Sequence, residues 1–302
     1  PTRLLDLGSQ GCTQSSDIRL VSYENGFRYI ALSHRWGGSQ HFTTTRFNVH
    51  NHKRGIRFAD LPKTFQDSIV VARSLDIRYL WIDALCIIQD DENEWHGEAL
   101  LMGNIYRNAE CTIAVHDAPD DSAGFLEASL QSPKSVSIEC AQDNTSLTVS
   151  LRSNFRAAVD RSELTRRGWV LQERYLSSRT LHFTETSIFL EDGSSSFPSL
   201  LAADPFDSRL SPFNIGTRMH NQKYDFAWFK LLERYSATKL TYESDKLPAI
   251  SGLVKLLQQD IQGRFVMGVW DTMFHKGLLW AAHLYPLMRP RHRRAPSWSW
   301  VS

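Results

Sequence analysis

Short apolar runs alternate with amphipathic segments in the first half of the chain. Residues 28–34, 79–88 and 111–118 are nearly continuous in apolar side chains, which is typical of parallel strands covered on both faces. Residues 61–75 and 90–109, between these runs, carry apolar positions at helical spacing, and acidic side chains open the second segment, where they favour a helix N-terminus. The alternation predicts a parallel sheet built from right-handed βαβ units.

The second half of the chain has a different pattern. Strand pairs are expected at residues 135–140 with 146–151 and at 179–183 with 187–192. Helices are expected at residues 165–176, 225–240 and 245–261, the last of them stopped by Gly263, and residues 193–215 read as a mobile loop rich in Ser, Pro and Asp. A basic cluster at residues 289–294 precedes an aromatic, strand-like run. We therefore predict an α/β protein with a parallel core at residues 18–125, on which residues 126–302 pack as an α+β elaboration.

Composition narrows the class of protein. The 302 residues are 42% apolar and 22% charged, which excludes wholesale disorder, and 34 basic against 33 acidic side chains leave a net charge of +1. This balance gives no bulk electrostatic basis for binding nucleic acid or an anionic membrane. No apolar run approaches the ~20 residues that span a bilayer, and the first residues lack a secretory pattern. The four cysteines include no CxxC pair, so we expect a reducing, cytoplasmic location.

One acidic residue breaks the pattern of its helix. At about 100° per residue, Glu98 lies within the apolar stripe that contains Met102, Ile105 and Ala109. A carboxylate that faces a core loses hydration, which costs several kcal/mol unless the group is paired or protonated. Such groups serve either as structural ion-pair partners or as functional carboxylates, and both interpretations of Glu98 remain open at this stage.

Other polar residues follow predicted strands of the sheet. Asp83 ends the second apolar strand, while Ser33 and Trp36 follow the first. Ligands of open parallel sheets bind beyond the carboxyl ends of the strands, so these side chains and Glu98 are expected to line one crevice. The sequence has no HExxH motif, no metal-spaced cluster and no dinucleotide or P-loop motif, so we expect no metal and no cofactor.

Five long strings of the sequence resemble the fungal heterokaryon incompatibility (HET) domain family. They occupy residues 29–38, 61–91, 94–115, 166–183 and 295–300, in the order of the family. The resemblance implies a fungal protein that triggers or executes cell death in non-self recognition, with self-association or partner signalling proteins. The family is also described as distantly similar to TIR domains, which have a flavodoxin-like parallel sheet and in several cases cleave NAD.

This resemblance assigns roles to particular residues. Glu98 matches the family glutamate and resembles the TIR glutamate in following a Trp, so it is the predicted catalytic carboxylate of an NAD glycohydrolase, with NAD as substrate rather than cofactor. Ser33, Arg35, Trp36, Asp83 and Arg167 are the predicted substrate-binding residues, with the indole stacking on a base and a guanidinium taking the pyrophosphate. Two alternatives are a non-enzymatic module that acts by assembly and a diverged member that performs small-molecule biosynthetic chemistry.

Overall fold

The computed structural model describes residues 1–8, 18–38, 42–129, 135–139, 146–150, 154–192, 222–281 and 295–302. Its strands are β1 (Arg3–Asp6), β2 (Arg19–Ser22), β3 (Tyr29–Ser33), β4 (Tyr79–Trp81), β5 (Cys111–Val115), β6 (Ser135–Glu139), β7 (Ser146–Ser150), β8 (Arg179–Phe183), β9 (Ile188–Asp192), β10 (Phe265–Val266) and β11 (Val269–Trp270). Its α-helices are α1 (Val49–Arg54), α2 (Lys63–Ser74), α3 (Asp83–Cys86), α4 (Glu92–Asn108), α5 (Leu126–Ser129), α6 (Gly168–Leu176), α8 (Gln222–Ser236), α9 (Ser251–Ile261) and α10 (Phe274–Gly277). The predicted loop at residues 193–215 and the basic cluster at residues 289–294 lie outside the described residues.

The centre of the molecule is a seven-stranded sheet in the order β2-β1-β4-β3-β5-β8-β9. Strand β3 runs parallel to β4 and β5, and β5 runs parallel to β8, whereas β1, β2 and β9 add antiparallel edges. The four parallel strands follow the order in which flavodoxin-like sheets begin, with the first strand between the second and the third. The predicted α/β class with a mostly parallel sheet is therefore confirmed.

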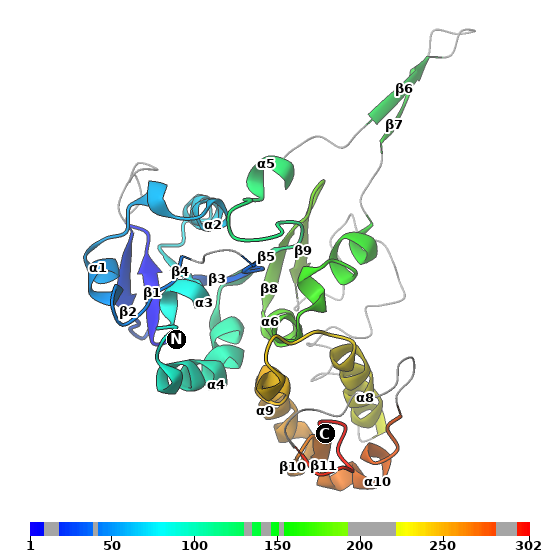
Figure 1. The fold of residues 1–302 in the computed structure, drawn as a ribbon. Helices are drawn as coiled ribbons and strands as arrows, with labels where there is room; N and C mark the ends of the chain where they lie inside the picture. The colour runs from blue at the N-terminus through cyan, green and yellow to red at the C-terminus, as the bar shows by residue number, and fades with distance from the viewer. Residues whose placement is uncertain are drawn as a thin grey trace.

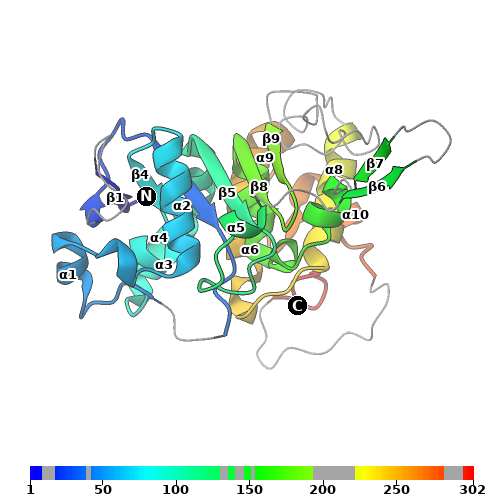
Figure 2. The ribbon, with the colours of Figure 1, turned by 90° about the horizontal axis from the view of Figure 1, so that it is seen from above.

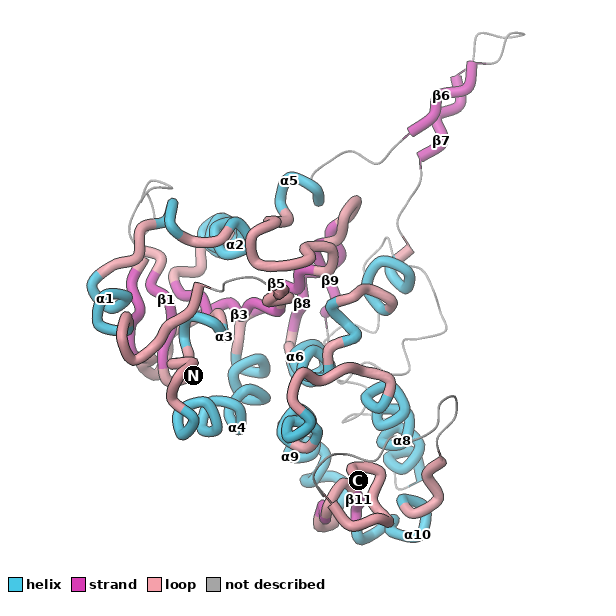
Figure 3. The backbone as a smooth tube through the Cα atoms, in the orientation of Figure 1, coloured by secondary structure: helices cyan, strands magenta, loops and turns pink. Residues whose placement is uncertain are grey.

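Helices cover both faces of this sheet (Figure 1). Helix α2 lies over one face, and α4 and α6 lie over the other, as the view from above also shows (Figure 2). Helices α8, α9 and α10 form a lobe with the small β10–β11 sheet beyond α6, and the β6–β7 hairpin projects away from the body of the molecule (Figure 3).

The two faces of the parallel strands differ in polarity. Ile113 and Val115 of β5 are buried, and their β8 neighbours in register are Leu181 and Phe183. On the opposite face, the register aligns Ser33, Ala114 and His182 in one row across β3, β5 and β8, and Ala31, Thr112 and Thr180 in the row before it. These residues are buried as well. The face toward α6 therefore carries small and polar side chains where apolar ones are usual.

Helix α4 has the signals that its sequence predicts. The Asp91 side chain accepts a hydrogen bond from the backbone N–H of Glu94, at 3.2 Å, and so caps the N-terminus. At Gly103 the helix meets α9 so closely that a Cβ would lie 2.8 Å from the Cα of Gly252 and 3.0 Å from Leu176 of α6. Glycine at this position therefore permits the three helices to cross in contact.

The structure corrects four expectations about local structure. The apolar run at residues 79–88 is not one strand, because β4 ends at Trp81 and Asp83 begins the single helical turn α3. Helix α9 begins only at Ser251, after two short 3₁₀ turns, and the left-handed residue at its end is Gln262 rather than Gly263. Residues 295–302 form turns, not a strand. Strands β1 and β2 were not predicted, since neither is marked by a long apolar run.

Candidate functional site

The candidate site lies at the carboxyl end of β3, next to β5. The chain leaves β3 for α2 on one face of the sheet and leaves β4 for α4 on the other (Figure 1). In open α/β sheets, the crevice for a ligand forms where successive connections diverge in this way. Ser33 is the last residue of β3 and is 2% exposed, so its side chain is buried at the carboxyl end of this strand.

Ser33 pairs with a carboxyl group from α6. Its Oγ donates a hydrogen bond of 2.5 Å to Oε2 of Glu173, which is 5% exposed. Burial raises the pKa of Glu173 to about 7, although the charge of Arg167 and the Ser33 hydrogen bond act to lower it. The negative charge of Asp83 is a further cause that raises this pKa. Glu173 therefore exchanges a proton near neutral pH, as a general acid or base must.

Asp83 and Trp36 form the more exposed part of the site. The indole N–H of Trp36 donates to Oδ2 of Asp83 at 2.9 Å, and Oδ1 of Asp83 lies 4.0 Å from Nδ1 of His34. The Asp83 side chain is 24% exposed, whereas that of His34 is almost fully buried. Asp83 thus presents a carboxylate to solvent beside the buried carboxyl group of Glu173.

The two predicted arginines lie in different surroundings. Arg167, which precedes α6, donates through Nη1 to the backbone carbonyl of His34, and its charge acts on Glu173. The charge of Arg35 instead acts on the carboxylate of Asp120. A β-carbon at neighbouring Gly37 would collide with Asp120, so the backbone after Arg35 passes directly against this residue. Its hydrogen bond to His34 and the effect of its charge on Glu173 thus join Arg167 to the site, whereas Arg35 interacts with Asp120.

Glu98 is buried, as its helical position predicts, with 2% of its surface exposed. Its Oε1 accepts hydrogen bonds from the backbone N–H of Thr2, at 2.9 Å, and from the Thr2 hydroxyl. Its Oε2 is buried and has no hydrogen-bond partner among the described residues. The hydrogen bonds of Glu98 thus join it to Thr2, just before β1, and its catalytic role stays a prediction.

The structure therefore brings Ser33, Trp36, Asp83 and Arg167 together around Glu173, a carboxyl group that was not among the predicted site residues. Glu173 lies three residues after Val170 and three before Leu176, which are both buried, so it lies in the apolar stripe of α6. The angular argument applied to Glu98 would have identified it.

Thiol and metal chemistry receive no support from the described residues. Cys86 is fully buried, and burial raises the pKa of its thiol to about 12, so the reactive thiolate is absent near neutral pH. Within the described ranges, no group of three His, Cys, Asp or Glu side chains is placed to hold a metal ion. In the same ranges, no helix combines the length and the apolar character that crossing a bilayer requires.

Comparison with known proteins agrees with the resemblance noted in the sequence. Residues 29–173 match the family model "Heterokaryon incompatibility protein (HET)". The curated protein "Heterokaryon incompatibility protein 6, OR allele" of Neurospora crassa is 31% identical over 140 residues, which cover 42% of this chain and 20% of that protein. The chain thus spans about a fifth of the length of this relative. No solved structure is significantly similar to the chain. Residues 29–173 are therefore similar to the heterokaryon incompatibility (HET) family.

Proposed function

We propose that this chain acts in fungal non-self recognition, in the cytoplasm, as a cell-death effector or signalling protein. The match of residues 29–173 to the HET family supports this role, as does the name of the Neurospora crassa relative. The matched segment includes both Ser33 and Glu173, so the candidate site lies within the region that defines the family.

We further propose that the site hydrolyses the N-glycosidic bond of NAD. In this reaction NAD⁺ and water give nicotinamide, ADP-ribose and a proton: the bond between nicotinamide and ribose breaks, and a bond from ribose to the water oxygen forms. The leaving nicotinamide takes the bonding electrons, so the ribose becomes cation-like in the transition state. A nearby carboxylate stabilises this charge, as in glycosidases, and a base accepts the proton of the water.

The observation that carries the proposal is the buried Glu173 carboxyl group, hydrogen-bonded to Ser33 and with a pKa of about 7. A group with this pKa accepts the proton of water efficiently at neutral pH. Asp83, beside it and open to solvent, suits the stabilisation of a ribosyl cation. The Trp36 ring offers a surface for the nicotinamide or adenine base, and Arg167 suits a phosphate group.

Glu98 is the alternative carboxylate, because the resemblance to TIR domains assigns it the same role. Its buried Oε2 has no hydrogen-bond partner in the described part of the chain and so keeps an unused capacity to accept a hydrogen bond. The two carboxyl groups have similar burial, so the same Glu→Gln exchange at each position gives a matched comparison.

The experiment measures nicotinamide release from NAD by the purified protein at high concentration, for wild type, Glu173→Gln and Glu98→Gln. The proposal expects release by wild type and a loss of about 100-fold or more in Glu173→Gln, since the carboxylate acts in the transition state. Full turnover by Glu173→Gln with loss in Glu98→Gln would transfer the role to Glu98. If wild type releases no nicotinamide even when assembled, while the protein still kills cells, the non-enzymatic alternative holds instead.

A further inference from the structure

Glu173 is followed on α6 by a half-buried charged residue, Arg174, which reaches in another direction. Its Nε and Nη2 donate to the two carboxylate oxygens of Glu191 on β9, at 2.7 and 3.1 Å. Its Nη1 donates to Oδ1 of Asp160 at 2.7 Å. Helix α6 therefore makes polar contacts with β3 through Glu173 and with β9 through Arg174. These two strands lie on opposite sides of the β5–β8 pair in the sheet.

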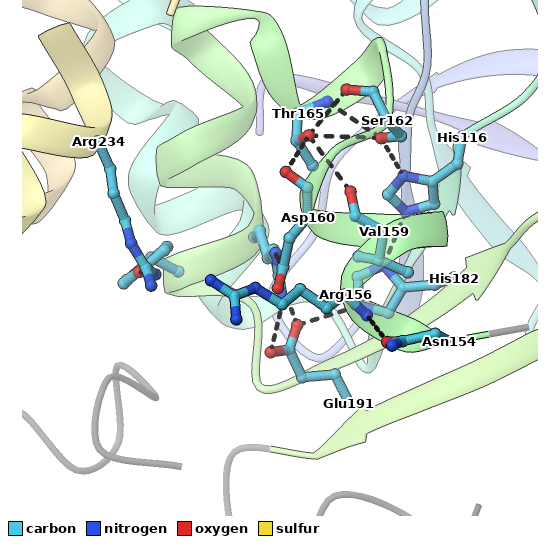
Figure 4. A network of polar contacts seen from close by, with 12 residues as sticks. His116, Asn154, Arg156, Val159, Asp160, Ser162, Thr165, His182, Glu191 and Arg234 are labelled. Carbon is cyan, nitrogen blue, oxygen red and sulfur yellow. Dashed lines mark hydrogen bonds and ion pairs between the residues drawn. The ribbon is translucent and has the colours of Figure 1, made fainter. Parts of the chain in front are cut away.

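The partner of Arg174 is itself held by a chain of hydrogen bonds (Figure 4). Oε2 of Glu191 lies 3.0 Å from Nε2 of His182, Nδ1 of His182 lies 2.8 Å from Nε2 of His116, and Nδ1 of His116 lies 2.7 Å from Oγ of Ser162. An ionised carboxylate only accepts hydrogen bonds, so His182 donates to Glu191, His116 donates to His182, and Ser162 donates to His116. The charge of Glu191 therefore determines which nitrogen of each histidine in this hydrogen-bond network carries the proton.

The side chains of this hydrogen-bond network do not change protonation state near neutral pH. Burial lowers the pKa of His116 to about 2 and also lowers that of His182, so both imidazoles are neutral. Burial acts to raise the pKa of Glu191, but the charge of Arg174 and the hydrogen bond from His182 lower it further than burial raises it. The ion pair between Arg174 and Glu191 therefore persists across the pH range in which Glu173 gains or loses its proton.

Apolar packing is incomplete where α6 lies over the sheet. Ala114 sits between Ser33 and His182 in the register, and its methyl group is the smallest side chain of that row. A small cavity remains there, bounded on the helix side by Val170 and Arg174. Arg174 thus lies beside this cavity, where its polar contacts with Glu191 and Asp160 add to the apolar packing that holds α6 on the sheet.

We infer that Arg174 is a positioning residue for Glu173: its ion pairs with Glu191 and Asp160 set the rotation of α6 that holds Glu173 against Ser33. This inference rests on the proposed function for the catalytic meaning of Glu173, although the positioning itself does not. A side-chain group lies about 6 Å from the helix axis, so a rotation of about 20° moves it by about 2 Å. Such a shift is enough to break a hydrogen bond.

The test compares Arg174→Gln and Arg174→Lys with Arg166→Gln. Arg166 is a matched control, since it is an exposed arginine next to the start of α6 that pairs with Glu163. The readout is the titration of the Glu173 carboxyl carbon by NMR in protein with labelled glutamate, assigned with Glu173→Gln. This readout needs no NAD, so it stays valid if the proposed reaction is absent.

In Arg174→Gln we expect the pKa of Glu173 to fall from about 7 toward the usual value near 4.3, because the released carboxyl group reaches water. Arg174→Lys keeps the charge but cannot bind both oxygens of Glu191 in a fork, so its Glu173 pKa should lie between those of wild type and Arg174→Gln. Arg166→Gln should titrate as wild type. Nicotinamide release should drop by between about 10- and 100-fold in Arg174→Gln and remain unchanged in Arg166→Gln.

A folded Arg174→Gln protein whose Glu173 still titrates near 7 would overturn the inference, whatever its melting temperature, because a purely structural role lowers stability without moving this pKa. If Arg174→Gln does not fold, Glu191→Gln replaces it, since that variant keeps the pair between Arg174 and Asp160. The same criterion then applies to Glu191→Gln.

Discussion

The hydrogen bond between Ser33 and Glu173 makes a prediction that can be worked out in magnitude. Ser33→Ala removes the hydroxyl that donates to Oε2 of Glu173 at 2.5 Å and leaves the rest of the buried site in place. The lost hydrogen bond stabilises the ionised carboxylate more than the neutral acid, since a hydrogen bond to a charged acceptor is the stronger of the two. The substitution should therefore raise the pKa of Glu173.

The size of the shift follows from the strength of such a bond. A hydrogen bond to a charged group contributes about 1.5–3 kcal/mol, and one pKa unit corresponds to about 1.4 kcal/mol. The neutral acid also loses part of its hydrogen bonding, so the lower end of this range applies. The pKa of Glu173 should rise by about one unit, from about 7 to about 8.

The assay is NMR titration of the Glu173 carboxyl carbon in wild type and in Ser33→Ala. Ser68→Ala serves as a control, because Ser68 is also a buried serine, but its hydroxyl donates to the carbonyl of Thr64 on α2. The control should leave the pKa of Glu173 unchanged. An unchanged or lowered pKa in Ser33→Ala would refute the reasoning, since it would mean that Ser33 does not stabilise the carboxylate.

Three further predictions concern stability and reactivity. Because the pKa of Glu173 is higher in the folded than in the unfolded protein, ionisation of this group lowers the stability of wild type as pH rises from about 4 to 7. Glu173→Gln should therefore gain up to about 3 kcal/mol in free energy of unfolding relative to wild type across this range, as measured by urea unfolding at pH 4.5 and 8. A stability difference that is the same at both pH values would contradict the raised pKa. Gly103→Ala should lower the free energy of unfolding by about 1–3 kcal/mol, because the added Cβ collides with Gly252. Gly97→Ala on the same helix, with no atom near its Cβ, should raise the free energy of unfolding by about 0.5–1 kcal/mol. Equal effects of the two substitutions would exclude the close crossing of α4 and α9. Cys86 should resist iodoacetamide at pH 8 in the native protein and react once the protein is unfolded, as followed by mass spectrometry, and rapid native labelling would contradict its burial.

Local pattern predicted much of the fold, because the elements concerned carry their own periodicity. The strands at β3 and β5 and the helices α2 and α4 follow from apolar runs and helical spacing, and the burial of Glu98 follows from its angle on α4. The strand predicted at residues 79–88 is longer than the observed β4, since an apolar run fits a buried helical turn as well as a strand.

The site was predicted less completely because its contacts are distant in sequence. Ser33 and Glu173 are 140 residues apart, and Thr2 and Glu98 are 96 residues apart. Periodicity shows that a carboxyl group faces inward, but the partner depends on which strands become neighbours. The placement of β8 beside β5 decides this for Glu173, and no local signal encodes it.

The central claim is that the Glu173 carboxyl group beside Ser33 accepts the proton of the attacking water. The most direct measurement is the pH dependence of nicotinamide release from NAD between pH 5 and 9, for wild type and Ser33→Ala. We predict that activity rises with pH around a midpoint near 7 in wild type, and that Ser33→Ala moves this midpoint upward by about one unit. Nicotinamide release with the same midpoint in both proteins would contradict it.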